Sequence, residues 1–243
     1  MQEQKLTKRE TFKEQAYFDE QVRYNTEMLK KFNDVIENPD TGLEHRTNLR
    51  HTVFRRQLEQ LITRYSRGEK IESLKESFPQ IVDALIAYHE EPGHAVYNFK
   101  YFDAYIYALW LVSLAILLDI DDDYFNKLIR ELNNNRRDAM YESLVALRVS
   151  GRSENSEILY PKPYNLLFDA LNSTGTEQIN LIKKFLTQYY KGMKKAYWYD
   201  SHLGEDAGFF GYWCFELAAF VKMLKIDDSS FYENIFYPRD LAR

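Results

Sequence analysis

The chain has 243 residues, of which 45% are hydrophobic and 28% charged, with nine glycines and six prolines. These proportions exclude a disordered, collagen-like or low-complexity chain and are typical of a globular protein with one large or two small domains. The single cysteine excludes an internal disulfide and favours a reducing cytoplasm. The net charge of -5 argues against direct nucleic-acid binding, which usually requires a basic surface.

Apolar residues recur at helical spacing along most of the chain, and alternating strand-like runs are absent. Thr7 and Glu10 have the spacing of a capping box, which predicts a first helix that starts there and continues to about Glu37. Apolar positions follow the i, i+3, i+4, i+7 pattern through residues 49–65. Gly68 is expected to end this second helix.

The third predicted helix covers residues 71–89, with Pro79 bending or dividing it. A strongly apolar helix is predicted at 101–118. Its uncharged stretch, 104–118, is shorter than the roughly twenty residues that span a bilayer. We therefore expect a buried core helix and no membrane contact. The remaining predicted helices are 124–134, 137–149, 164–171, 177–199 and 209–225, followed by a short turn at 229–234.

An internal repeat is visible when the chain is compared with itself. The tripeptide Ile-Asp-Asp occurs at 120–122 and again at 226–228, each time after an apolar, aromatic-rich helix. The sequence therefore predicts an all-α fold, a multi-helix bundle of roughly eight to ten helices. Its two related halves would pack through the apolar helices 101–118 and 209–225.

The domain boundary is predicted between these halves, with residues 1–135 forming an N-terminal region and residues 136–243 a C-terminal domain. An alternative boundary is the loop 150–163, because prolines, glycine and serines concentrate there.

His89 and His94 invite comparison with zinc proteases, which place two histidines four residues apart on one helix face. Here the spacing is five residues, and Pro92 and Gly93 interrupt the helix between them. The segment therefore predicts a loop after a helix and no metal site.

No strong catalytic or phosphate-binding motif occurs in the chain. Asp200, Ser201 and His202 supply a carboxylate, a hydroxyl and an imidazole, but neighbours in sequence rarely form a catalytic triad. Cys214 lies in an apolar run, which predicts a buried thiol. Glu216 follows it, and a structural hydrogen bond is the expected role for a carboxylate there. We therefore expect no catalytic residue and no cofactor.

Acidic residues cluster in the two Ile-Asp-Asp turns and in one loop. Beyond residue 70 the chain holds 18 Lys and Arg against 25 Asp and Glu. As caps, these carboxylates would stabilise the start of the next helix. As a surface, they would attract a basic protein partner. The candidates for such binding are Asp121, Asp122, Asp123, Glu205, Asp206, Asp227 and Asp228.

The C-terminal part of the chain carries a set of motifs in a fixed order. The motif residues are Trp198, Asp200, His202, Gly211, Tyr212, Trp213, Phe215, Glu216, Ala218, Ala219, the run 226–230, Tyr237, Pro238, Arg239, Asp240 and Leu241. This set resembles the C-terminal domain of the bacterial PoNi family, which are immunity proteins against polymorphic nuclease toxins. The N-terminal half is similar to the family's N-terminal domain through Arg56, Leu58, Tyr65, Gly68 and Ile71.

The resemblance implies an all-helical protein without catalysis, which binds a cognate DNase toxin in the cytoplasm of the cell that makes it. Such toxins are secreted effectors, and type VI secretion is one route. The resemblance implies no membrane contact and leaves homo-oligomerisation open. An excess of carboxylates agrees with this function, because a DNase presents Lys and Arg along its DNA groove.

Two other classes of function remain open from the sequence. A helical adaptor would use the same surfaces for a partner unrelated to toxins. A hydrolase would need Asp200, His202 and Glu216 to converge in one pocket.

Overall fold

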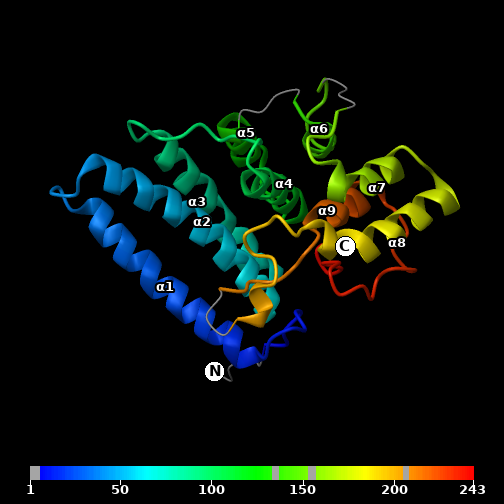
Figure 1. The fold of residues 1–243 in the computed structure, drawn as a ribbon, viewed down its shortest axis with the longest axis horizontal. Coiled ribbons are helices and arrows are strands. Elements are labelled where there is room, and N and C mark those ends of the chain that lie inside the picture. The colour runs from blue at the N-terminus through cyan, green and yellow to red at the C-terminus, as the bar shows by residue number, and fades with distance from the viewer. Residues whose placement is uncertain (1–5, 133–136, 153–156, 205–207) are drawn as a thin grey trace. The chain divides into compact units, whose positions relative to one another are not determined.

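The computed structural model describes residues 6–132, 137–152, 157–204 and 208–243. Within these ranges the chain forms nine α-helices and one short 3-10 helix, with no strand, which confirms the all-α prediction. The helices are α1 (Gln15–Glu37), α2 (Leu43–Arg67), α3 (Ile71–His89), α4 (Phe102–Leu117), α5 (Asp122–Leu132), α6 (Ala139–Ala146), α7 (Pro161–Leu171), α8 (Gly175–Gly192) and α9 (Phe215–Leu224) (Figure 1).

The helices belong to two compact units, each assembled from separate segments of the chain. Unit 1 comprises residues 1–96, 120–127 and 200–211. Unit 2 comprises residues 97–119, 128–199 and 212–243. The chain crosses between the two units five times, and α5 contributes residues to both.

In unit 1, α2 packs against α1 on one side and α3 on the other (Figure 1). The turn between α2 and α3 depends on Gly68, whose φ is +100°. A Cβ added there would lie 2.0 Å from the main-chain oxygen of Thr7. The N-terminal arm, residues 6–14, therefore passes over a surface that only glycine leaves open.

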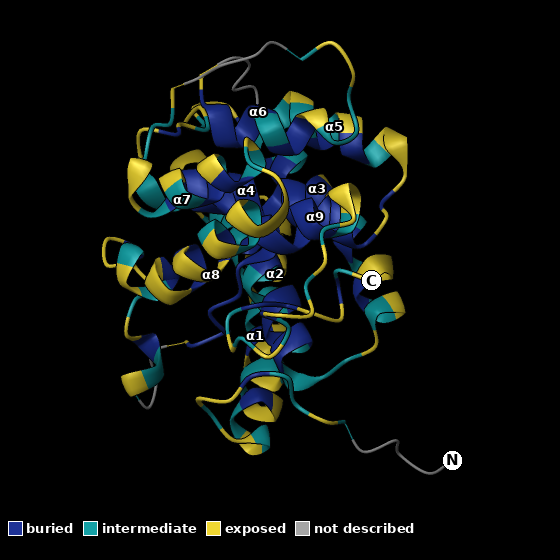
Figure 2. Ribbon diagram, turned by 90° about the vertical axis from the view of Figure 1, so that its right-hand side faces the viewer, coloured by how far each residue is buried: buried dark blue, intermediate teal, exposed yellow. Residues whose placement is uncertain are grey.

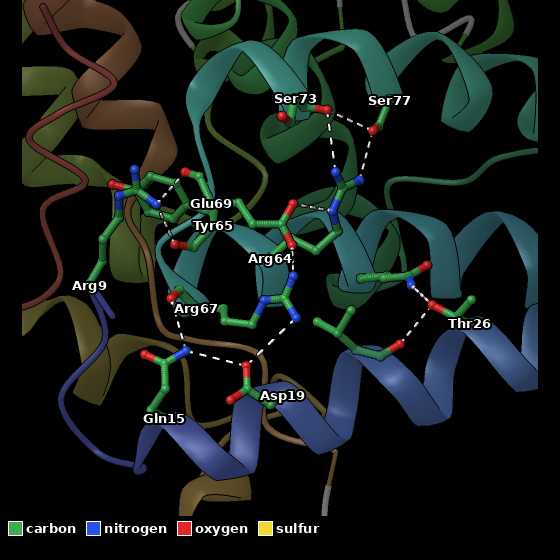
Figure 3. A network of polar contacts seen from close by, with 12 residues as sticks. Arg9, Gln15, Asp19, Thr26, Arg64, Tyr65, Arg67, Glu69, Ser73 and Ser77 are labelled. Atoms are coloured by element: carbon green, nitrogen blue, oxygen red, sulfur yellow. Dashed lines mark hydrogen bonds and ion pairs between the residues drawn. The ribbon is translucent and has the colours of Figure 1, made fainter. Parts of the chain in front are cut away.

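Charged side chains fasten the N-terminal arm to this turn (Figure 3). Arg9 donates from Nη1 to the main-chain oxygens of Tyr65 at 2.9 Å and Glu69 at 2.8 Å. The Glu69 carboxylate in turn accepts from Arg64 Nε at 2.7 Å and pairs with Arg67. The arm and the end of α2 are thus held by one network that also satisfies carbonyl oxygens at a helix end.

The predicted start of the first helix is wrong. Residues 6–14 are not helical, and α1 begins only at Gln15. Glu10 is buried and its carboxylate accepts from the main-chain nitrogen of Phe12 at 2.7 Å. The carboxylate thus shapes the arm instead of closing a capping box with Thr7.

The segment 200–211 completes unit 1. The Ser66 hydroxyl donates to the main-chain oxygen of Phe210 at 2.6 Å, and the Tyr17 hydroxyl donates to that of Phe209 at 3.2 Å. The ring of His202 lies 4.8 Å from that of Phe12. A piece of the C-terminal sequence is therefore built into the N-terminal helices.

In unit 2, α4 and α9 pack against each other, as the apolar sequences predict. Nearly every residue of α4 is buried, as is most of α9 (Figure 2). Lys222 of α9 donates to the main-chain oxygen of Leu117 at 2.8 Å and pairs with Asp119 at 2.9 Å. Both apolar helices of the repeat thus lie in one unit.

The predicted helix at 209–225 is too long at its start. Residues 209–214 are not helical, with Gly211 at a φ of +119°, and α9 begins at Phe215. The aromatic side chains of this stretch are nevertheless buried, so burial here does not require a helix. The preceding helix, α8, ends at Gly192, before its predicted end at residue 199.

Candidate functional site

The excess of acid in this chain belongs to unit 1. Unit 1 carries 16 Lys and Arg against 23 Asp and Glu, whereas unit 2 carries 16 against 14. The two units therefore have formal charges of -7 and +2. A basic partner would therefore be attracted to unit 1 more strongly than to unit 2.

The outer side of α3 carries an acidic stripe. Glu72, Glu76, Asp83 and Glu90 are all exposed. At about 100° of rotation per residue, these four positions fall within about 40° of one another around the helix axis. The opposite side of α3 holds buried apolar residues that include Phe78 and Leu85, so the stripe faces solvent.

The start of α5 adds three more exposed carboxylates: Asp121, Asp122 and Asp123. Tyr124 links them to α3, because its hydroxyl donates to Asp83 Oδ2 at 3.4 Å. We call the seven carboxylates on these two segments the acidic face: Glu72, Glu76, Asp83, Glu90, Asp121, Asp122 and Asp123.

Some of these aspartates also have local structural roles. Asp121 accepts from the main-chain nitrogen of Tyr124 at 2.9 Å, which caps α5. Asp123 pairs with Lys127 one turn later at 2.7 Å. Capping and an exposed position coexist here, so the two interpretations of these residues do not exclude each other.

The second Ile-Asp-Asp turn lies in unit 2, and its carboxylates bond locally. Asp227 accepts from the main-chain nitrogen of Ser229 at 3.0 Å, and these hydrogen bonds lower its pKa. Asp228 accepts from the Tyr237 hydroxyl at 3.0 Å. Both residues thus shape the turn. The other two candidates, Glu205 and Asp206, lie outside the described residues.

Most motif residues of the C-terminal part form the core of unit 2. Tyr212, Trp213, Phe215, Tyr237, Pro238 and Leu241 are buried, whereas Asp240 is exposed. Cys214 donates its main-chain N–H to the oxygen of Phe236 at 2.8 Å, which joins the start of α9 to the C-terminal segment. These residues are therefore typical of a motif that specifies a fold.

Glu216 is fully buried at the start of α9. Its Oε1 accepts from the Tyr164 hydroxyl of α7 at 2.6 Å, which agrees with the structural hydrogen bond expected from the sequence. Burial raises its pKa to about 7, against the opposing effects of Tyr164, its own main chain and Cys214. The same burial raises the pKa of the Cys214 thiol well above its usual range, as expected for an inert cysteine.

The three residues of the hydrolase alternative belong to different units. Asp200 and His202 belong to unit 1, whereas Glu216 lies inside unit 2 with no exposed surface. The rings of His89 and His94 are 5.3 Å apart, but the helix ends at His89, as predicted. Within the described ranges, no group of three or more His, Cys, Asp or Glu side chains is arranged to hold a metal ion.

Among the helices described above, none combines the length and the apolar content that a membrane crossing requires.

The α3 stripe was not predicted from the sequence. Its signal was present, because Glu76, Asp83 and Glu90 are spaced by seven residues, which is nearly two helical turns. Pro79 lies between Glu76 and Asp83 and obscures the pattern. The link to Asp121–Asp123 appears only in the folded chain.

Comparison with known protein families supports the resemblance stated from the sequence. Residues 1–130 match the family described as PoNe immunity protein (PoNi), N-terminal, and residues 136–241 match PoNe immunity proteins (PoNi), C-terminal. The chain belongs to this PoNi family, which supports an immunity role against a nuclease toxin.

A solved structure shares the fold. Protein PA2201 from Pseudomonas aeruginosa superposes with a TM-score of 0.76 at 16% sequence identity, and the alignment covers 99% of this chain and 92% of that one. No curated protein matches the chain.

Proposed function

We propose that the protein binds and inhibits a cognate DNase toxin through the acidic face of unit 1. The observation that carries this proposal is the concentration of seven exposed carboxylates on α3 and the start of α5, within a unit of charge -7. The protein would act in the cytoplasm of the producing cell and protect its DNA from a toxin made for secretion.

An acidic inhibitor suits a toxin that binds DNA. A DNase needs cationic side chains along its groove, because phosphates dominate the affinity for DNA. An acidic inhibitor approaches the same groove with a favourable long-range field, which accelerates association and excludes DNA. No group that cleaves DNA or toxin is required from the inhibitor.

Protection of DNA tests the proposed function directly. We expect the nuclease toxin encoded beside this protein's gene to form a stable complex with it. We also expect plasmid cleavage to stop once the inhibitor equals the toxin in concentration. An unrelated DNase provides the control, because a nonspecific polyanion would slow it as well. Undiminished cleavage by the neighbouring toxin despite excess protein would refute the proposal.

Charge reversal tests the acidic face. The double variant Glu76→Lys with Glu90→Lys is expected to reduce the toxin association rate about tenfold at low salt, with a smaller effect at high salt. Neither side chain forms a hydrogen bond or ion pair within the described ranges, so folding should be unaffected. Stopped-flow fluorescence at two salt concentrations measures the rates.

A matched variant separates this face from net charge alone. Asp169→Lys with Glu177→Lys makes the same change of charge at exposed positions of unit 2. This control should bind the toxin nearly as fast as the parent. Equal slowing in both variants would mean that overall charge matters and that the contact lies elsewhere.

A further inference from the structure

Unit 2 contains a surface pocket that is separate from the acidic face. Its volume is about 350 Å³. One wall comes from α8 and the other from the turn that follows the second Ile-Asp-Asp sequence. The lining residues are Lys183, Leu186, Thr187, Ser229, Ser230, Phe231, Tyr232, Glu233 and Asn234.

The pocket combines an apolar floor with a polar rim. Leu186 and Phe231 are buried, whereas Lys183 and Ser230 are exposed. Neither the Lys183 ammonium nor the Ser230 hydroxyl has a partner among the described residues. The rim therefore offers one full positive charge and one hydroxyl donor to a ligand.

The wall formed by the turn is held in shape before any ligand arrives. Asp227 accepts from the main-chain nitrogen of Ser229, and Asp228 accepts from the Tyr237 hydroxyl, each at 3.0 Å. The ring of Phe231 packs edge-on against that of Tyr237 at 5.2 Å. Because this wall is already ordered, a ligand that binds there incurs a smaller entropic cost.

The two charged residues that line this opening, Lys183 and Glu233, differ in their contacts. Tyr232 lies beneath the guanidinium groups of Arg239, at 4.8 Å, and Arg243, at 4.4 Å. Glu233, the acidic residue of the lining, pairs with Arg239. Lys183 is left without a counter-ion in the described chain, which favours an anionic ligand.

We propose that this pocket binds a peptide segment of a protein partner in which an apolar side chain lies beside a carboxylate. The apolar group would cover Leu186 and Phe231, and the carboxylate would accept from Lys183 and Ser230. A free phosphate suits the pocket less well, because it would leave the apolar floor exposed. The volume is at the low end of ligand pockets, which span roughly 300–1,000 Å³, and so fits a side chain with its neighbouring backbone.

This site goes beyond the proposed inhibition of a DNase, because it lies in the unit of charge +2 and involves none of the acidic face. It can therefore be tested without a toxin. The probe is N-acetyl-phenylalanine, which joins an aromatic ring to a carboxylate, and its matched control is the uncharged N-acetyl-phenylalaninamide.

Amide chemical shifts of the isotope-labelled full chain report binding. The acid is expected to shift the amides of residues 229–234 saturably and to bind about tenfold more tightly than the amide. Lys183→Met should remove this preference. Lys184→Met should keep it, because Lys184 is exposed on the same helix but does not line the pocket.

Three results would overturn the proposal. The first is equal binding of acid and amide, and the second is no saturable shift at residues 229–234. The third is saturation of the same amides by inorganic phosphate at lower concentration than by the acid, which would assign the pocket to a phosphoryl group.

Discussion

Glu216→Gln is expected to remove a large dependence of stability on pH. Burial raises the pKa of Glu216 to about 7, from an ordinary value of 4.5. The folded protein therefore holds this proton more tightly than the unfolded chain does. The resulting contribution to the free energy of unfolding is about 3 kcal/mol. It is fully present below about pH 4.5 and is lost as the pH rises through 7.

Denaturant unfolding at about pH 5 and pH 8 measures this contribution. The glutamine side chain keeps an oxygen that accepts from Tyr164 but cannot ionise. The variant's free energy of unfolding, relative to that of the parent, should therefore rise by about 3 kcal/mol from about pH 5 to pH 8. The exposed Glu177→Gln serves as the control and should follow the parent at both. Parallel curves for parent and Glu216→Gln would show that this carboxyl titrates normally.

Gly68→Ala is expected to lower the free energy of unfolding by about 3 kcal/mol or more. The new Cβ would meet a main-chain oxygen of Thr7 at 2.0 Å and its carbonyl carbon at 2.6 Å, at a φ of +100°. Backbone cannot move aside as a flexible side chain can, so the N-terminal arm must shift or detach. Thermal and denaturant unfolding measure the loss.

Two other glycines of unit 1 distinguish the cost of the positive φ from the cost of the steric clash. Gly93 has a φ of +81° but nothing within 4 Å of an added Cβ, so Gly93→Ala should show the conformational cost alone, about 1 kcal/mol. Gly42 has neither constraint, and Gly42→Ala should stay within about 1 kcal/mol of the parent. If Gly68→Ala lowered the free energy of unfolding no more than Gly93→Ala does, the N-terminal arm would move away from the new Cβ at no energetic cost.

The ends of α2 and α3 could be predicted because their signals are local. Gly68 follows an amphipathic pattern and adopts the left-handed conformation that ends α2. Pro92 and Gly93 follow His89, where α3 ends as expected. Pro79 is accommodated inside α3 without dividing it.

Errors arose where distant contacts override local preference. Thr7 and Glu10 have helix-start spacing, but Arg9 draws the N-terminal arm onto the end of α2, sixty residues away. Residues 209–214 have the apolar content of a buried helix, but they form a buried segment without helical structure. Composition alone cannot distinguish the two conformations.

The candidate site was predictable only in part, for a similar reason. Asp121, Asp122 and Asp123 are conspicuous in the sequence, and the structure places them on an exposed turn. That Asp83 lies near them depends on the hydrogen bond from Tyr124 to α3, for which no sequence signal exists. The surplus of acid could be counted from the sequence, but its concentration in unit 1 required the fold.

Because unit 1 is assembled from three separate segments of the chain, its structure limits which recombinants of related genes can fold. A genetic crossover within residues 128–199 would draw segment 200–211 from one parent and the remainder of unit 1 from the other. Ser66 and Tyr17 bond there to main-chain oxygens, which any parent supplies. The ring contact of Phe12 with His202 needs particular side chains. The buried ring of Phe209 likewise contacts Phe12 and Phe18. Viable hybrids should therefore retain aromatic residues at these positions on both sides of the contact.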